Sequence, residues 1–260
     1  MKKIGFIGMG NMARAIASGF IAGGAARAED LYAYAPRFER LSDFCVPLGI
    51  HACRSVSELL ESVDTVVMAV KPYVVEGVLA QIREQLRGKA MLSVVAGYTC
   101  EKYRPLVDES VRVQYIMPNT PCMVGEGMLL FEQENTLTAE ERETAVRMFE
   151  ALGEVEILPT HLMAPAMGIS GCGPAFIAMV IEALGDAGVK YGLPRAVAYR
   201  LASQTALGTG KMQLETGMHP GEIKDGVCSP AGTTIRGVEA LEACGVRHAF
   251  MEAVRATQEM

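Results

Sequence analysis

The chain has 260 residues, of which 50% are hydrophobic and 21% are charged, and its formal net charge is −6. This composition provides enough apolar side chains for a buried core and excludes an intrinsically disordered chain. The acidic balance, without a stretch rich in Lys and Arg, argues against general binding of nucleic acid. The length allows one or two domains.

Membrane insertion and metal binding are not expected from the sequence. No apolar run reaches the roughly 18 residues of a membrane span. The apolar start at Ile4–Gly8 is interrupted by Asn11 and Arg14, and no convincing cleavage site follows, so we expect a cytoplasmic protein rather than a secreted one. The seven cysteines form no C-x-x-C pair and have no zinc-like spacing with the four histidines, which predicts reduced packing cysteines and no metal site.

Short β-type runs alternate with helical patterns in the first half of the chain. Strands are predicted at Lys3–Gly8, Leu31–Ala35, Thr65–Val70, Ala90–Val95 and Val111–Met117, and helices at Asn11–Gly23, Ser57–Ser62 with Ser57 as a cap, and Tyr73–Leu86. Met128–Phe131 and Val155–Leu158 flank a predicted helix at Ala139–Leu152 and are expected to close the sheet. This alternation indicates an α/β domain whose mostly parallel sheet is covered on both faces.

The pattern changes after Pro159, because no convincing strand follows. Helices are predicted at Pro174–Tyr191, Pro194–Thr216, Val238–Ala243 and Arg247–Gln258. We therefore divide the chain into a dinucleotide-binding unit, 1–159, and an all-helical unit, 160–260. Long helices with wide apolar faces in so small a unit are typical of faces buried against another subunit.

Gly8–Ala13 reads G-x-G-x-x-A between a predicted strand and a predicted helix. In that context the two glycines allow a tight turn and a close approach of the backbone to a pyrophosphate, and the helix amides face the phosphate charge. A Gly-rich turn in an unrelated α/β protein is the alternative interpretation. The full context favours a dinucleotide.

The residues at the end of the second predicted strand indicate which dinucleotide is bound. An NAD enzyme usually places Asp or Glu there, whereas this chain has Tyr34-Ala35-Pro36-Arg37. Arg37, with Arg40 one helical turn further on, can pair with a 2′-phosphate, which favours NADPH and leaves NADH possible. The alternative is that both arginines are solvated surface residues.

Further candidates end the neighbouring strands, where ligands bind in doubly wound sheets. The complete set of predicted cofactor-binding residues is Gly8, Gly10, Asn11, Met12, Arg37, Ala69, Val70, Lys71, Pro72, Ala96, Gly97 and Asn119.

A series of motifs then follows in order along nearly the whole chain. It comprises Gly8–Ala13, Ala69–Pro72, Met117–Pro121 with Gly125–Gly127, Ser170–Pro174, Gly188–Pro194 and Ser229–Thr234. Together they resemble the pyrroline-5-carboxylate reductase family. The resemblance implies a Rossmann-type domain, a helical domain that interlocks with its partner in a homodimer, and further assembly of dimers in some members. It also implies NAD(P)H-dependent reduction of 1-pyrroline-5-carboxylate to L-proline, the last step of proline biosynthesis.

The chain departs from the family pattern at several positions. Tyr115 and Met167 stand where Arg and Thr are usual, and Ala164 stands for Asp. Cys172 and Ala231 are milder changes, for Ser and Gly. Because Tyr115 and Met167 remove polar groups near the expected site, two alternatives stay open: a related imine reductase with another substrate, and a catalytically silent dinucleotide-binding regulator.

The segment Ser229–Thr234 is the candidate substrate anchor. Pro230 and Gly232 shape a turn before a helix whose free amides favour an anion, and Thr233 and Thr234 add hydroxyls. We assign substrate binding to Ser229, Gly232, Thr233 and Thr234, and the resemblance supports a catalytic hydrogen bond from Thr234 to the ring nitrogen. Helix capping by Ser229 or Thr233 is the alternative.

The predicted reaction needs little acid–base machinery, because a protonated ring imine is already electrophilic at C5. The protein must hold the nicotinamide against that carbon, anchor the carboxylate and exclude water. A β-hydroxyacid dehydrogenase is the nearest enzymatic rival, because such enzymes share the two-part layout and resemble this chain in the cofactor half. They place a catalytic Lys on the long helix that corresponds to Pro174–Leu184, which contains none.

Overall fold

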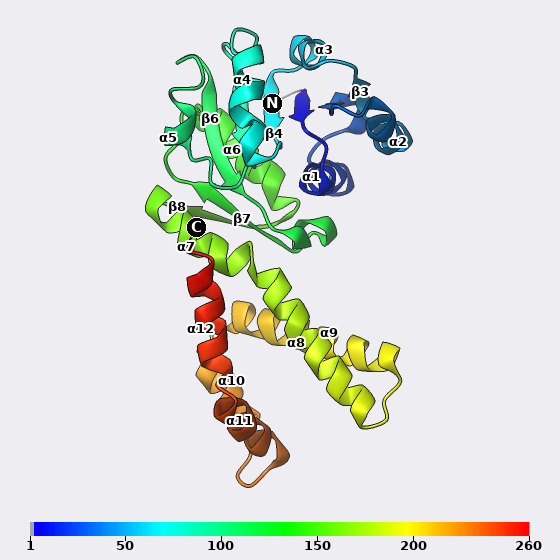
Figure 1. The fold of residues 1–260 in the computed structure, drawn as a ribbon, viewed down its shortest axis with the longest axis vertical. Helices are drawn as coiled ribbons and strands as arrows, with labels where there is room; N and C mark the ends of the chain where they lie inside the picture. Colours follow the sequence, from blue (N-terminus) through cyan, green and yellow to red (C-terminus); the bar gives the residue numbers. More distant parts are fainter. Residues whose placement is uncertain (1–2, 260) are drawn as a thin grey trace. The chain divides into compact units, whose positions relative to one another are not determined.

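The computed structural model describes residues 3–259 and divides into two compact units, one ending at Gly171 and the other beginning at Cys172 (Figure 1). The boundary between the two units falls after α7 (Thr160–Ser170), whereas the boundary predicted from the sequence lies before that helix, at residue 159. The two units are described in turn.

The described part of the first unit contains one eight-stranded sheet in the order β3-β2-β1-β4-β5-β6-β7-β8. The strands are β1 (Ile4–Ile7), β2 (Leu31–Tyr34), β3 (His51–Cys53), β4 (Thr65–Met68), β5 (Ala90–Ser93), β6 (Arg112–Met117), β7 (Gly127–Glu132) and β8 (Gly153–Leu158). All neighbours are parallel except β6 and β7, which are antiparallel. The predicted mostly parallel sheet is confirmed, and its strand order reverses direction between β1 and β4, where doubly wound proteins bind ligands.

Helices cover both faces of this sheet because alternate strand residues point to opposite sides. Phe6 and Val67 belong to one core cluster with α1 (Asn11–Ala22), α2 (Phe38–Leu48) and α6 (Ala139–Glu150). Ile7 and Val66 belong to the other, with α3 (Val56–Ser62), α4 (Val75–Ile82), α5 (Cys100–Tyr103) and α7 (Thr160–Ser170). The sheet is therefore the middle of three layers.

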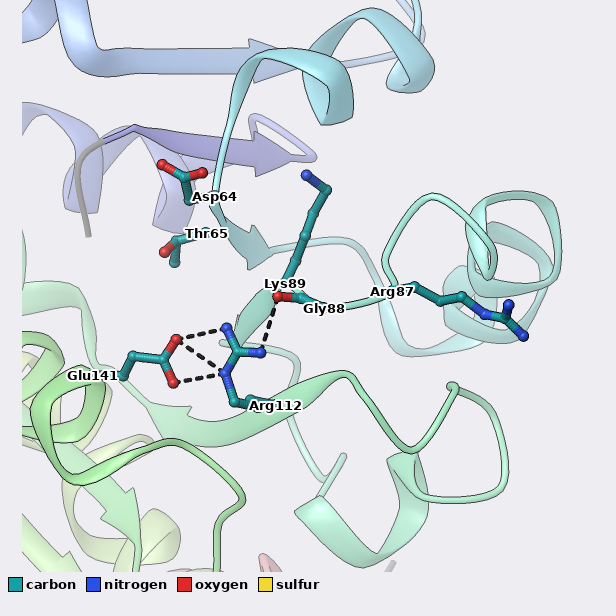
Figure 2. Close-up of a pocket in the computed structure, with 7 residues that line it drawn as sticks. All are labelled: Asp64, Thr65, Arg87, Gly88, Lys89, Arg112 and Glu141. Carbon is teal, nitrogen blue, oxygen red and sulfur yellow. Dashed lines mark hydrogen bonds and ion pairs between the residues drawn. The ribbon is translucent and has the colours of Figure 1, made fainter.

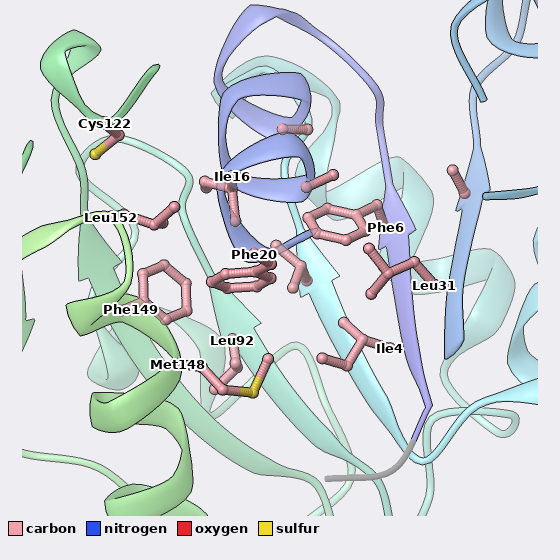
Figure 3. Packing of buried hydrophobic residues seen from close by; sticks show 14 of the residues in the cluster. Ile4, Phe6, Ile16, Phe20, Leu31, Leu92, Cys122, Met148, Phe149 and Leu152 are labelled. Atoms are coloured by element: carbon pink, nitrogen blue, oxygen red, sulfur yellow. The ribbon is translucent and has the colours of Figure 1, made fainter. Parts of the chain in front are cut away.

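An aromatic cluster joins α1 and α6 to the sheet (Figure 3). Phe149 on α6 meets Phe20 on α1 edge to face at 5.2 Å between ring centroids. Phe131 on β7 meets Phe149 in the same way at 5.5 Å. All three side chains are fully buried. Edge-to-face pairs add about 0.5–1.5 kcal/mol to the area they bury. This packing holds α1, and so the turn before it, firmly on the sheet.

Three local features differ from the sequence expectation. Ser55, not Ser57, caps α3, since its hydroxyl accepts a hydrogen bond from the Glu58 amide at 3.1 Å. The predicted helix at Tyr73–Leu86 is a short 3-10 turn, Pro72–Val74, followed by α4. The sequence analysis assigned no range to α2 or β3, because α2 carries Pro47 near its end and β3 has three residues.

At the amino ends of β4, β5 and β6 an ion pair borders a cleft of about 370 Å³ (Figure 2). Arg112 on β6 forms a bidentate pair with Glu141 on α6, with nitrogen–oxygen distances of 2.7 and 2.8 Å, and also donates to the Gly88 carbonyl at 2.9 Å. Glu141 completes a capping box with Thr138 at the start of α6. The ion pair thus ties α6 to the strand edge opposite the ligand-binding edge.

Low pH is expected to weaken the ion pair between Arg112 and Glu141. The hydrogen bonds from Arg112 lower the pKa of Glu141 from 4.5 to about 2. A carboxyl whose pKa is depressed by folding stabilises the fold above its unfolded-state pKa, and loses that contribution as pH falls from about 4.5 to about 2. Glu141→Gln should therefore lower the free energy of unfolding by about 1–2 kcal/mol at pH 7, and much less at pH 2.5. Urea unfolding at both pH values tests this, and a deficit that does not depend on pH would contradict it.

The described residues of the second unit form helices and no strand. They are α8 (Gly173–Lys190), α9 (Arg195–Thr216), α10 (Pro220–Gly226), α11 (Thr233–Ala243) and α12 (Val246–Ala256). The predicted all-helical character is confirmed, and α10 is an addition to it. α8 and α9 form a hairpin, pinned where Arg195 pairs with Asp186 at 2.5 Å and donates to the Tyr199 hydroxyl at 2.8 Å.

Large apolar side chains are exposed along this hairpin. They are Ile177, Met179 and Leu184 on α8 and Leu201, Leu207, Met212 and Leu214 on α9. The segment Thr160–Lys190 has a mean hydropathy of 1.6 over 18 residues, of which 6% are buried within the chain, so by length and composition it could cross a membrane. The expectation that no apolar run reaches that length is corrected here. Helices that pack against another subunit share this composition.

Candidate functional site

A cleft of about 900 Å³ opens at the carboxyl ends of the strands in the first unit. Its walls are the segments that follow β1, β2, β4, β5 and β6. The lining residues include Gly8–Ala15, Ala35–Arg37, Arg40, Ala69–Val74, Val94, Ala96, Met117, Pro118, Thr120 and Met123. Its position is the point where the strand order reverses, and its size is that of a cofactor site.

Two glycines at the end of β1 have different structural tasks. Gly8 has φ +94°, which L side chains rarely adopt, and a Cβ there would lie 2.7 Å from the Ala69 carbonyl oxygen. Gly8 therefore lets β1 and the end of β4 approach each other. Gly10 has an ordinary φ of −79°, and its Cβ would meet no protein atom within 4 Å. The space beside Gly10 belongs to the cleft, so that glycine keeps room for a ligand close to the backbone.

The cleft is arranged for an anion. α1 begins at Asn11 with no side-chain cap at Gly10, so its first amides face the opening. The charged residues among its lining are Arg14, Arg37, Arg40 and Lys71, and no acidic residue is among them. A cofactor with several phosphate groups fits these walls, and the absence of an acid at Ala35–Arg37, directly after β2, fits a phosphate on the ribose.

Ten of the twelve predicted cofactor-binding residues line this cleft. They are Gly8, Gly10, Asn11, Met12, Arg37, Ala69, Val70, Lys71, Pro72 and Ala96. Gly97 and Asn119 do not. The structure adds Arg14, Tyr73, Val94 and Met123, which the sequence analysis did not select. Of these, Arg14 carried a signal in the sequence, since a cation in the first turn of a helix opposes the helix dipole.

The Asn119 side chain makes two hydrogen bonds within the first unit. Its amide nitrogen donates to the Ser170 carbonyl at 2.9 Å, and its amide oxygen accepts from the Met128 backbone at 2.9 Å. The side chain is almost fully buried, and thus connects the end of α7 to β7. Its neighbours Pro118 and Thr120 line the cleft instead.

Tyr115, one of the departures from the family pattern, restrains the loop after β5 through its hydroxyl. Its buried hydroxyl accepts a hydrogen bond from the Gly97 amide at 3.1 Å and donates to the Met117 sulfur at 3.6 Å. Burial raises the pKa of Tyr115, so the phenol stays protonated. Gly97 has φ +72°, and its carbonyl accepts from Lys102 at 2.6 Å. The loop that presents Ala96 to the cleft is therefore fixed on both sides of Gly97.

Tyr115→Phe keeps the ring and removes the hydroxyl. The loss of one neutral hydrogen bond should lower stability by about 0.5–1.5 kcal/mol and speed amide exchange at Gly97 by roughly 2- to 12-fold. Hydrogen exchange followed by NMR measures this, with the Val95 amide, which donates to Ser93, as internal control. Unchanged exchange at Gly97 would show that the hydroxyl does not restrain the loop.

In the second unit the segment Ser229–Thr234 forms a tight turn before α11. The Gly232 amide donates to the Ser229 carbonyl at 3.0 Å, and Ala231 between them has φ +61°. This conformation costs alanine about 1–2 kcal/mol, and such strain is concentrated at functional turns. α11 has Gly232 as its N-cap without a side-chain hydrogen bond, so neither Ser229 nor Thr233 caps it. Thr233 and Thr234 are exposed in its first turn.

The described residues hold no group of three or more His, Cys, Asp or Glu side chains arranged for a metal ion. The four histidines are placed outside the cleft and the turn. His219 caps α10 through its Nδ1, and His51 stacks on Tyr32. These histidines have structural contacts, and the site chemistry rests on the other residues.

A Gly-x-Gly turn at the strand reversal, free helix amides and a basic cleft define a dinucleotide-binding protein of the doubly wound α/β class. Comparison with known proteins narrows the class. Residues 160–260 match the family model "Pyrroline-5-carboxylate reductase dimerisation", and residues 3–97 match "NADP oxidoreductase coenzyme F420-dependent".

Full-length relatives agree with the family models. The chain is 43% identical to the pyrroline-5-carboxylate reductase of Treponema pallidum, covering 97% of each chain, and 39% identical to that of Escherichia coli, covering 99% of this chain and 96% of the other. The crystal structure of the Plasmodium falciparum pyrroline carboxylate reductase with NADP bound superposes with a TM-score of 0.89 at 32% identity, covering 98% and 95% of the two chains. The chain belongs to the pyrroline-5-carboxylate reductase family.

Proposed function

We propose that this protein is a cytoplasmic oxidoreductase that uses NADPH to reduce 1-pyrroline-5-carboxylate to L-proline. The observation that carries the proposal is the basic, acid-free cleft at the strand reversal, in a chain that belongs to this reductase family. Residues 160–260 are proposed as the substrate-binding and dimerisation unit, which keeps the boundary expected from the sequence.

Cofactor binding is assigned to the cleft residues. Asn11 and Met12 begin α1, where the free amides hold the pyrophosphate, and Gly10 provides the space for it. Arg37, at the start of α2, and Lys71, after β4, provide positive charge for the remaining phosphate oxygens. The loop from Val94 to Gly97 is assigned to the nicotinamide end. When bound there, NADPH supplies the hydride.

Substrate binding is assigned to the turn before α11. The amide of Thr233 and the hydroxyl of Ser229 hold the substrate carboxylate at a helix start, where an anion is favoured. Gly232, whose own amide bonds the Ser229 carbonyl, shapes the turn and lets the carboxylate come close to the backbone. The Thr234 hydroxyl bonds the ring nitrogen and orients the protonated imine, which is electrophilic without an acid from the protein. The substrate is a small molecule, and no nucleic acid takes part.

A direct assay separates the possible functions. Purified protein with racemic pyrroline-5-carboxylate should consume NADPH and form proline, and NADH should serve less well. Consumption only with other cyclic imines would make it a reductase with an altered substrate. Tight NADPH binding without turnover of any imine would make it a silent regulator. Oxidation of β-hydroxyacids would support the dehydrogenase alternative.

The chain carries a dimerisation domain, and we propose that it forms a homodimer through α8 and α9, with further assembly of dimers as a possible higher state. Sedimentation at micromolar concentration should give twice the mass of one chain. Ile177→Glu together with Leu184→Glu places charges on an exposed apolar face and should shift the protein to monomers. Val46→Glu, at an exposed apolar residue of α2, is the matched control. A stable, active wild-type monomer would contradict the proposal.

A further inference from the structure

Arg14 connects two separate parts of the cofactor cleft. It lies in the first turn of α1, where its Nε donates to the Met9 carbonyl at 3.2 Å. Its Nη2 donates to the Arg40 carbonyl at 3.3 Å, and its guanidinium covers the Phe44 ring at 4.7 Å from the centroid. One side chain therefore joins the Gly8–Gly10 turn to α2.

The position of Arg14 is unfavourable for the isolated helix. The amino end of a helix carries a partial positive charge, so a cation in the first turn destabilises it, and α1 has no acidic residue in that turn to offset the effect. A residue that breaks a local rule in a ligand cleft is a candidate for a functional role. The three contacts of Arg14 connect the start of α1 to α2.

The element that Arg14 fixes carries the arginines assigned to the cofactor ribose. Arg37 is the N-cap of α2, without a side-chain cap, and Arg40 lies in its first turn; both are exposed in the cleft. The start of α2 also packs on the core through Leu41, which is 1% exposed, and through Phe38, whose ring lies 4.2 Å from the Arg54 guanidinium. Arg14 adds a polar link to this packing, between the Met9 carbonyl of the Gly-rich turn and the Arg40 carbonyl of α2.

We propose that Arg14 is a positioning residue that determines the preference for a 2′-phosphorylated cofactor. By tying α2 to the Met9 carbonyl, it holds Arg37 and Arg40 where they meet the phosphate monoester on the ribose while the turn holds the pyrophosphate. This inference rests on the proposed use of NADPH. Without the tie, the first turn of α2 moves, and the ribose phosphate loses its arginines although the pyrophosphate site remains.

Direct binding tests the proposal without turnover. Dissociation constants for NADPH and NADH are measured by fluorescence titration with no substrate present, for wild type, Arg14→Met and Arg14→Lys. Arg14→Met removes both donors and should weaken NADPH about tenfold more than NADH. Arg14→Lys keeps the charge but lacks the planar fork, and should lose part of the preference, by about two- to fivefold. Circular dichroism confirms that each variant is folded.

Two further variants identify the route of the effect. Arg37→Ala should weaken NADPH by about tenfold or more and leave NADH nearly unchanged. In that background Arg14→Met should cost NADPH less than about threefold, because coupled residues are not additive. Arg54→Met is the matched control, since it removes a cation from an α2 ring but leaves the hydrogen bonds between the Gly-rich turn and α2, and should not change the ratio of the two constants.

The outcomes decide the proposal. A selective loss of NADPH affinity that falls below about threefold in the Arg37→Ala background supports it. Equal weakening of both cofactors would show that Arg14 holds the pyrophosphate itself and would overturn it, as would an unchanged preference in Arg14→Met or a loss equally large in Arg54→Met. If wild type binds NADPH but does not reduce pyrroline-5-carboxylate, the proposed reaction fails and the binding comparison still decides the role of Arg14.

Discussion

Replacing Thr234 with alanine is expected to lower kcat/KM for pyrroline-5-carboxylate by roughly 10- to 150-fold. A positioned hydrogen bond to a charged group contributes about 1.5–3 kcal/mol, and about 1.4 kcal/mol corresponds to a tenfold change in rate. The affinity for NADPH should stay within about twofold, because the proposed contact is made to the substrate ring. Thr234→Ser restores the hydroxyl and should recover most of the activity.

The geometry of α11 makes this variant a usable probe. Thr234 is exposed in the first turn, and the helix is capped by Gly232 without a side-chain hydrogen bond, so alanine should cost little stability. Ser62→Ala on α3 is the matched control, because that hydroxyl donates to its own helix, at the Glu58 carbonyl, and lies outside the cleft and the proposed interface. Steady-state kinetics with both substrates and thermal unfolding give the result.

Two outcomes would remove Thr234 from the reaction. If Thr234→Ala unfolds, the residue is structural, and the helix start depends on it. If the variant is folded and fully active, Thr233 or Ser229 carries the role, or the substrate binds elsewhere.

Alanine substitutions at Gly8 and Gly10, the two glycines of the G-x-G-x-x-A turn, are expected to have different effects on stability and on NADPH binding. Gly10→Ala should leave stability nearly unchanged and weaken NADPH at least about tenfold, because its Cβ meets no protein atom and extends into the cleft. Gly8→Ala should lower the free energy of unfolding by about 2–4 kcal/mol. There φ is +94° and the Cβ would lie 2.7 Å from the Ala69 carbonyl oxygen, which belongs to rigid backbone.

Urea unfolding and NADPH titration on both variants test this separation. Gly77→Ala on α4 is the control, because its Cβ also meets nothing within 4 Å and the residue is outside the cleft. NADPH binding unchanged in Gly10→Ala would show that no ligand approaches that backbone. Full stability of Gly8→Ala would mean that the β1–β4 junction relaxes at no cost.

The sequence by itself determined the features that depend on local patterns. Buried strands such as β1 and β4 are continuous apolar runs, and β1 is followed by the G-x-G-x-x-A turn, so the dinucleotide-binding edge of the sheet was predictable. The long helices α8 and α9 were predictable from their length, their apolar periodicity and the prolines near their starts. The ordered motifs identified the family.

The tertiary structure alone decided which residues these side chains contact. Asn119 lies in a motif that predicts a cofactor contact, but its amide bonds Ser170, which is 51 residues away, and Met128, which is 9 residues away on β7. Gly97 is held by Tyr115 from another strand. Arg14 joins α1 to the unpredicted helix α2. Each of these contacts spans 9 to 51 residues of the chain. Periodicity and capping report on neighbours within one or two turns, so partners at such separations follow only from how the elements pack.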